Sequence, residues 1–236
     1  MSATGANADP AELARFASLA ARWWDPEGPL KPLHALNPAR LAFIRERVPL
    51  AGIDACDVGC GGGLLAEALA AEGARVLGID LARETLEVAR LHALERGLPI
   101  EYREVAAERL AEERPQAFGL VSCMELIEHV PDPASLIRAL AALLAPGGEL
   151  FLSTIARTPR AFLHAILVGE HLLRLLPVGT HRYERFVRPS ELCAWLRAAG
   201  LEVVSLSGIE WRPWWPEARL VPDLSVNYLV HARKKR

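Results

Sequence analysis

Short apolar runs alternate with amphipathic segments from residue 53 onward, and the two kinds of segment differ in their hydrophobic period. Runs with strand-like patterning that end at turns or polar residues predict strands at 53–58, 75–80, 100–105, 118–124 and 149–154. Apolar residues at helical spacing predict helices at 64–72, 83–96 and 133–144, with glycine or proline stop signals after the last two. The alternation predicts repeated βαβ units and therefore a mainly parallel sheet with right-handed crossovers.

The last quarter of the chain departs from this alternation. After a predicted helix at 189–199, strands are predicted at 201–206 and 226–232, separated by a loop rich in tryptophan and proline and not by a helix. These two strands should pair as a hairpin, which places an antiparallel last strand on the sheet. We therefore expect an α/β, Rossmann-like fold with a seven-stranded, mostly parallel sheet flanked by helices. We also expect a single domain over 1–236, with an N-terminal helical cap at 1–48 and a helical insertion at 156–188.

The cap should begin with a helix that Asp9 caps and Pro10 opens. Its apolar face recurs at i, i+3, i+4 and i+7, through Phe16, Leu19, Ala20 and Trp23.

Composition narrows the class of protein. The 236 residues are 51% hydrophobic and 24% charged, which is ordinary for a globular chain. A net charge of −2 argues against a phosphate-backbone partner, so we expect no nucleic acid. No signal-peptide pattern and no apolar stretch of ~18 residues is present, which favours a cytoplasmic location. The cysteines lack metal-ribbon spacing and are expected to be free thiols: Cys56, Cys60, Cys123 and Cys193.

A glycine-rich loop follows the first predicted strand and leads into a helix at Leu64. Glycines there let a ligand approach the backbone at a helix N-terminus. The spacing Gly59-x-Gly61-x-Gly63 is not the dinucleotide pattern, and the Lys-Ser/Thr of a phosphate loop is absent. The alternative is a tight strand-to-helix turn without a ligand.

Two acidic residues sharpen the choice of cofactor. Asp57 precedes the loop and would repel a pyrophosphate, whereas S-adenosylmethionine (AdoMet) carries an ammonium and a sulfonium and no phosphate. Asp80 ends the next strand, close to the ~20-residue spacing at which an acid binds ribose hydroxyls, although it could simply cap a helix. With Met124 at the end of strand 118–124, these residues predict an AdoMet site formed by Asp57, Gly59, Gly61, Asp80 and Met124.

The segment after Met124 carries the candidate chemistry. If it is helical, Glu125 lies at i+3 and i+4 spacing from Glu128 and His129, so the three side chains could converge. Methylating a phenolic oxygen requires removal of its proton, and His129 is the natural base. Alternatively, bound Mg²⁺ could lower the pKa of the oxygen. We therefore predict His129 and Glu128 as catalytic and Glu125, Glu128 and His129 as metal ligands, against the alternative that this segment only forms the cofactor wall. His181 is a second candidate base that could equally be a surface residue.

The chain resembles the ubiquinone-biosynthesis O-methyltransferases over nearly its whole length. The segments that carry the resemblance are RWWDPEG (22–28), KPLH (31–34), NPAR (37–40), DVGCGGG (57–63), ARLHALE (89–95), CME (123–125), GTH (179–181) and VNY (226–228). The resemblance implies AdoMet contacts at Arg40, Gly59, Asp80 and Met124, and it supports Mg²⁺ at the Glu125 cluster. It implies methylation of a polyprenyl-substituted catechol and of a later demethylubiquinol, within a biosynthetic complex. Ala156 and the tryptophan-rich segment 210–215 depart from the family pattern.

A basic amphipathic helix is predicted within the insertion. Basic residues lie on a narrow arc of the helical wheel at Arg160, His164, His171 and Arg174, and apolar residues lie opposite at Phe162, Ile166, Leu172, Leu173 and Leu176. Such a helix can lie on an anionic membrane, where a polyprenyl substrate would be delivered, or it can pack as a lid over the site.

Two other functions are compatible with the sequence: a non-catalytic subunit that binds AdoMet or quinone, and a nicotinamide oxidoreductase.

Overall fold

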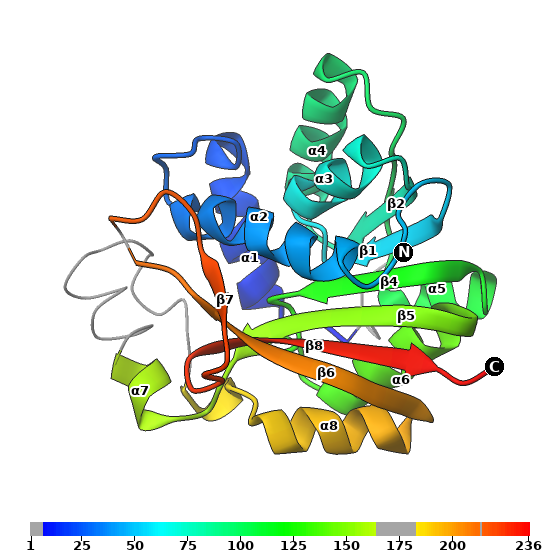
Figure 1. Cartoon of the computed structure of the whole chain (residues 1–236). Helices are drawn as coiled ribbons and strands as arrows, with labels where there is room; N and C mark the ends of the chain where they lie inside the picture. The colour runs from blue at the N-terminus through cyan, green and yellow to red at the C-terminus, as the bar shows by residue number, and fades with distance from the viewer. Residues whose placement is uncertain (1–6, 164–182, 213) are drawn as a thin grey trace.

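The computed structural model describes residues 7–163, 183–212 and 214–236. Its centre is an eight-stranded sheet in the order β3-β2-β1-β4-β5-β8-β6-β7 (Figure 1). The strands are β1 (Asp54–Val58), β2 (Arg75–Asp80), β3 (Glu101–Glu104), β4 (Phe118–Met124), β5 (Leu144–Ile155), β6 (Leu201–Glu210), β7 (Arg219–Val221) and β8 (Asn227–Lys234).

The sheet is parallel from β3 through β5, and β8 then runs antiparallel between β5 and β6. The predicted fold class is therefore confirmed, including the reversed last strand and its hairpin pairing with β6. The predicted number of seven strands is wrong by one. The additional strand, β7, pairs antiparallel with the end of β6, and three residues are too short to show a period of two.

Helices cover both faces of the sheet (Figure 1). One apolar core packs α2 (Lys31–Arg45), α3 (Leu64–Ala71) and α4 (Arg83–Glu95) on one face. A second core packs α5 (Ala107–Glu113), α6 (Pro133–Leu143) and α8 (Pro189–Ala198) on the other. The burial pattern of β4 is almost continuous, as expected for a central strand covered on both faces. The four cysteines are free and buried, as predicted.

The N-terminal cap begins with α1 (Pro10–Leu19), where the Asp9 side chain accepts a hydrogen bond from the Ala11 amide, as predicted. A 3₁₀ turn, η1 (Ala20–Arg22), follows and delivers Trp23 to a buried position. The rest of the described chain contains the short helices α7 (Pro159–Ala161) and η3 (Tyr183–Arg185). Most of the predicted amphipathic helix, and His181, lie outside the described residues.

The strand order reverses direction between β1 and β4, since the chain proceeds from β1 outward to β3 and then returns to β4. In open α/β sheets, ligands bind at such a point, beyond the carboxyl ends of the strands. Val58, Asp80 and Met124 end the three strands that meet there. The topology therefore brings the predicted cofactor and reactive residues to one edge of the sheet.

Candidate active site

The glycine loop between β1 and α3 is bent by residues with positive φ. Gly59, Gly61 and Gly63 have φ of 70°, 52° and 90°, a region that side-chain-bearing residues rarely adopt. The loop is also closely packed: a Cβ at Gly59 would lie 2.8 Å from Leu126 Cδ2, and one at Gly61 would overlap the Trp23 indole. The glycines therefore admit both the turn and the side chains that surround it.

Asp80 is held at the carboxyl end of β2 by two backbone amides. The Gly61 N–H donates to Oδ2 at 2.9 Å, and the Ala82 N–H donates to Oδ1 at 2.8 Å. Burial raises the pKa of Asp80 while both hydrogen bonds oppose that rise. The glycine loop and the Asp80 carboxylate are thus held against each other by the Gly61 hydrogen bond.

Asp57 ends up in different surroundings, although it also lies near the carboxyl end of a strand. It is 3% exposed, and Ser122 Oγ donates to its Oδ1 at 2.7 Å. Burial raises the pKa of Asp57 to about 7, against the opposing effects of Ser122 and the positive charge of Arg40. Asp57 can therefore exchange a proton near neutral pH.

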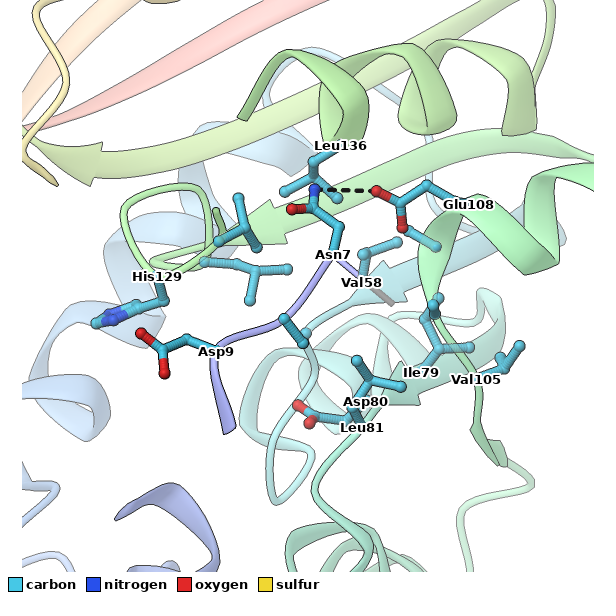
Figure 2. Close-up of a pocket in the computed structure, with 16 residues that line it drawn as sticks. Asn7, Asp9, Val58, Ile79, Asp80, Leu81, Val105, Glu108, His129 and Leu136 are labelled. Atoms are coloured by element: carbon cyan, nitrogen blue, oxygen red, sulfur yellow. Dashed lines mark hydrogen bonds between the residues drawn. The ribbon is translucent and has the colours of Figure 1, made fainter. Parts of the chain in front are cut away.

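A pocket of about 70 Å³ lies beside Asp80 (Figure 2). Gly59 and Asp80 line it, as does His129, and the segment Asn7, Ala8 and Asp9 forms another of its walls. The Asn7 amide donates to Glu108 Oε1 at 3.0 Å and to the Asp132 carbonyl at 2.7 Å. The volume of this pocket is smaller than the ~300–1,000 Å³ that ligand sites usually measure.

The segment after β4 is a turn and not the helix on which convergence of the predicted cluster depended. Glu125 has a positive φ of 51°, which ends the strand and redirects the chain. Its Oε1 accepts from Arg40 Nη2 at 3.0 Å and from Ser153 Oγ at 2.8 Å. The resemblance placed Arg40 at the cofactor, and in the structure its guanidinium pairs with the Glu125 carboxylate, while its positive charge lowers the pKa of Asp57.

Glu128 is buried at 4% exposure in the same turn. Thr154 Oγ1 donates to its Oε2 at 2.8 Å, and its Oε1 has no hydrogen-bond partner among the described residues. Burial and the neighbouring Glu125 carboxyl raise the pKa of Glu128 well above its usual range. Both effects favour the neutral form of the Glu128 carboxyl.

His129 faces the N-terminal cap. Its Nδ1 lies 2.8 Å from Glu12 Oε2, and its ring meets Phe16 edge-on at 5.3 Å between centroids. Burial raises the pKa of Glu12, but the hydrogen bond and charge of His129, together with the charges of Arg15 and Arg185, lower the pKa overall. The Glu12 carboxylate thus fixes the orientation of the imidazole.

The predicted metal ligands are not assembled as one set. Glu125 is paired with Arg40, Glu128 with Thr154, and His129 with Glu12. In the part of the chain that the structure describes, no three His, Cys, Asp or Glu side chains are placed to hold a metal ion. Binding of one Mg²⁺ ion by all three residues would require the pairings with Arg40 and Glu12 to break.

Sequence reasoning missed the contribution of the N-terminal cap. Trp23 packs on the glycine loop, Glu12 holds His129, and Asn7 reaches the pocket. The pairs that involve Asn7 and Glu12 join residues more than one hundred positions apart, and periodicity carries no signal over that separation. Of the other predicted cofactor residues, Gly61 contacts Asp80, and Met124 ends β4 at 9% exposure.

Comparison with known proteins agrees with this architecture. Residues 33–206 match the family model described as a methyltransferase domain. Among solved structures, the chain resembles magnesium protoporphyrin IX methyltransferase from Synechocystis PCC 6803 with bound SAM, at a TM-score of 0.66 and 18% identity, covering 97% of this chain and 100% of that one. It also resembles a SAM-dependent methyltransferase from Aquifex aeolicus, at a TM-score of 0.63 and 14% identity, covering 95% of this chain and 98% of the other. The fold and the matched domain define an AdoMet-dependent methyltransferase of class I.

Relatives closer in sequence narrow the assignment. The chain is 54% identical over 232 residues to the ubiquinone biosynthesis O-methyltransferase of Xanthomonas euvesicatoria pv. vesicatoria (strain 85-10), covering 98% of this chain and 97% of the relative. It is 53% identical over 234 residues to the protein of that name from Ralstonia nicotianae (strain ATCC BAA-1114 / GMI1000), covering 99% and 98%. The chain belongs to the ubiquinone biosynthesis O-methyltransferase family.

Proposed function

We propose that this methyltransferase acts on the phenolic or catecholic hydroxyl of polyprenyl hydroxyphenols and of demethylubiquinol. The observation that carries the proposal is the identity of 53–54% over nearly the full length with relatives named for oxygen methylation in ubiquinone biosynthesis. A buried carboxyl and an oriented imidazole at the end of β4 are the kind of groups that this reaction needs.

The reaction requires a nucleophilic oxygen beside an electrophilic methyl group. AdoMet supplies that methyl group on its sulfonium, so that a carbon–oxygen bond forms as the carbon–sulfur bond breaks. A neutral phenol attacks poorly, and a positioned base typically contributes ~10²–10⁴-fold to the rate. In the proposed mechanism the imidazole of His129 accepts the phenolic proton, and the Glu12 carboxylate stabilises the resulting imidazolium.

Glu128 has a different proposed role. Burial and the neighbouring Glu125 carboxyl raise the pKa of Glu128, and a protonated carboxyl at this position would donate a hydrogen bond to a substrate oxygen. The unpartnered Oε1 is the atom available for that bond. We therefore expect Glu128→Gln, which keeps a donor, to retain more activity than Glu128→Ala.

A requirement for Mg²⁺ at Glu125, Glu128 and His129 stays a prediction and enters no step above. It can be checked by assaying the enzyme with and without a chelator. Activity that is lost with the chelator and restored by Mg²⁺ would support it, whereas activity insensitive to the chelator would exclude it.

The direct test uses the full chain, AdoMet labelled on the methyl group and a short-chain demethylubiquinol. We expect label in the extracted quinol, a loss of turnover in His129→Ala, and about a tenfold lower kcat in Glu12→Gln, which removes the charge that stabilises the imidazolium but keeps the shape. Label transfer that is absent while AdoMet still binds would favour a non-catalytic binding subunit. Retention of NADH but not AdoMet would favour an oxidoreductase.

Membrane contact belongs to the same proposal because the substrate carries a polyprenyl chain. None of the helices in residues 7–163, 183–212 and 214–236 is long and apolar enough to cross a bilayer. We propose a cytoplasmic protein that contacts anionic lipid peripherally through the 156–188 insertion, within a ubiquinone-biosynthesis complex. Co-sedimentation with phosphatidylglycerol vesicles but not phosphatidylcholine vesicles would support the lipid contact, and no co-sedimentation with either would contradict it.

A further inference from the structure

Trp23 occupies a buried position that apolar packing alone does not explain. It is 5% exposed, and its indole lies against the glycine loop, where Cβ atoms at Gly61 or Gly62 would overlap the ring. Its Nε1 would lie 2.7 Å from a Cβ at Gly62. That N–H has no acceptor among the described residues. A buried N–H without an acceptor is destabilising, so a ligand that supplies an acceptor would bind more tightly there.

The neighbouring residue, Trp24, differs from Trp23 in that its indole N–H has an acceptor within the protein. Trp24 Nε1 donates to the Gly62 carbonyl at 3.0 Å, and its ring stacks on His92 at 3.5 Å between centroids. His92 is in turn held by Glu67 at 2.8 Å. The indole N–H of Trp24 is therefore satisfied by the protein, whereas that of Trp23, which packs on the same loop, is not.

Two further unpartnered polar atoms lie on the helix that faces this loop. Arg40 Nε is a buried donor, and Asn37 Oδ1 is a buried acceptor, one helical turn apart on α2. Asn37 Nδ2 donates to the Leu64 carbonyl at 2.9 Å, which turns this face of α2 towards the end of the glycine loop. Trp23 Nε1, Arg40 Nε and Asn37 Oδ1 are thus buried without partners among the described residues, with Trp23 on the glycine loop and Asn37 bonded to the residue that follows it.

This set matches the amino-acid end of AdoMet, which carries a carboxylate that accepts hydrogen bonds and an ammonium that donates them. We propose that Trp23 is a further cofactor-binding residue, whose indole N–H donates, together with Arg40 Nε, to the AdoMet carboxylate, while Asn37 Oδ1 accepts from the ammonium. The proposal rests on AdoMet binding and not on the identity of the methyl acceptor. It also gives the loop a second reason for glycine at 61 and 62, since both positions make room for the indole.

The test compares two ligands that differ in the amino-acid end. S-adenosylhomocysteine carries the carboxylate and ammonium, and 5′-methylthioadenosine has the same nucleoside and a thioether but lacks both. Affinities measured by isothermal titration calorimetry should show that Trp23→Phe weakens S-adenosylhomocysteine binding by about ten- to a hundredfold, because a hydrogen bond to a charged group is lost. Binding of 5′-methylthioadenosine should change by less than about twofold.

Trp24→Phe is the matched control, because it removes an indole N–H that donates to the protein itself. In this variant the ratio of the affinities for S-adenosylhomocysteine and 5′-methylthioadenosine should equal the wild-type ratio. If Trp23→Phe does not fold, benzothienylalanine at position 23 keeps the bicyclic shape and removes only the N–H. Unchanged S-adenosylhomocysteine affinity in either position-23 variant, an equal loss for both ligands, or the same ratio change in Trp24→Phe would overturn the proposal.

Discussion

The two ends of the active site are built in different ways. At the cofactor end, the bonds that fix Asp80 join residues 19 and 2 positions apart, within one βαβ unit. At the reactive end, the bonds of His129 and Asp132 to the N-terminal cap join residues 117 and 125 positions apart. The hydrogen bonds that fix Asp80 are therefore made within one βαβ unit, whereas the reactive turn is hydrogen-bonded to the docked cap. Substitutions at the reactive end should therefore lower kcat, and substitutions at the cofactor end should lower cofactor affinity.

The largest effect is expected at the reactive end. His129→Ala removes the proposed base, and kcat should fall by ~10²–10⁴-fold. Affinity for S-adenosylhomocysteine should stay within about twofold, since no bond of the glycine loop is lost. Steady-state kinetics and calorimetry on the same preparation check both parts, and a fall in affinity as large as the fall in kcat would contradict the separation of the two ends.

A smaller effect, on cofactor affinity more than on kcat, is expected for Asp80→Asn. The variant loses the charge that the Gly61 and Ala82 amides hold in place. Affinity for S-adenosylhomocysteine should fall by roughly ten- to a hundredfold, while kcat at saturating AdoMet should fall much less. Equilibrium dialysis with labelled ligand measures the first quantity, and an unchanged affinity would remove Asp80 from the cofactor site.

The contribution of Trp23 packing on the glycine loop can be tested by measuring the stability of glycine variants. Gly61→Ala should destabilise the protein by about 1–3 kcal/mol, because the added methyl group overpacks against Trp23. In a chain of this size, each kcal/mol lost lowers Tm by roughly 2–4 °C. Gly97→Ala is the control, because Gly97 also has a positive φ, of 65°, but has nothing within 4 Å of a Cβ. Thermal unfolding should show a larger loss for Gly61→Ala, and equal losses would mean that the Trp23 contact contributes nothing.

The smallest effect concerns pH. The pKa of Asp57 is about 7 in the folded protein and is raised from the value of 3.8 expected for an exposed carboxyl. The folded state therefore binds a proton that the unfolded chain releases between these values, so this group makes stability fall as pH rises through that window. Asp57→Asn should lose less Tm than the wild type between pH 5 and pH 8. An equal loss in both proteins would show that Asp57 titrates normally.

The extent to which the sequence predicts this molecule follows the same division. The boundaries of β2 and β4 are as predicted, because each strand is a short apolar run between clear turn signals. The sequence also predicted the edge of the sheet at which Gly59 and Asp80 line a pocket. It did not predict that a turn with positive φ at Glu125 would direct His129 towards Glu12 and away from a shared metal site. That outcome depends on tertiary contacts with the cap, which no local pattern reports.

Transfer of a methyl group to oxygen is the central claim, and the structure of the product tests it most directly. The enzyme is supplied with AdoMet carrying ¹³C in its methyl group and with a short-chain demethylubiquinol, and the product is analysed by carbon NMR. We expect a single labelled methoxy carbon bonded to the quinol oxygen. A labelled methyl group on a ring carbon, or no labelled product from enzyme that retains AdoMet, would contradict it.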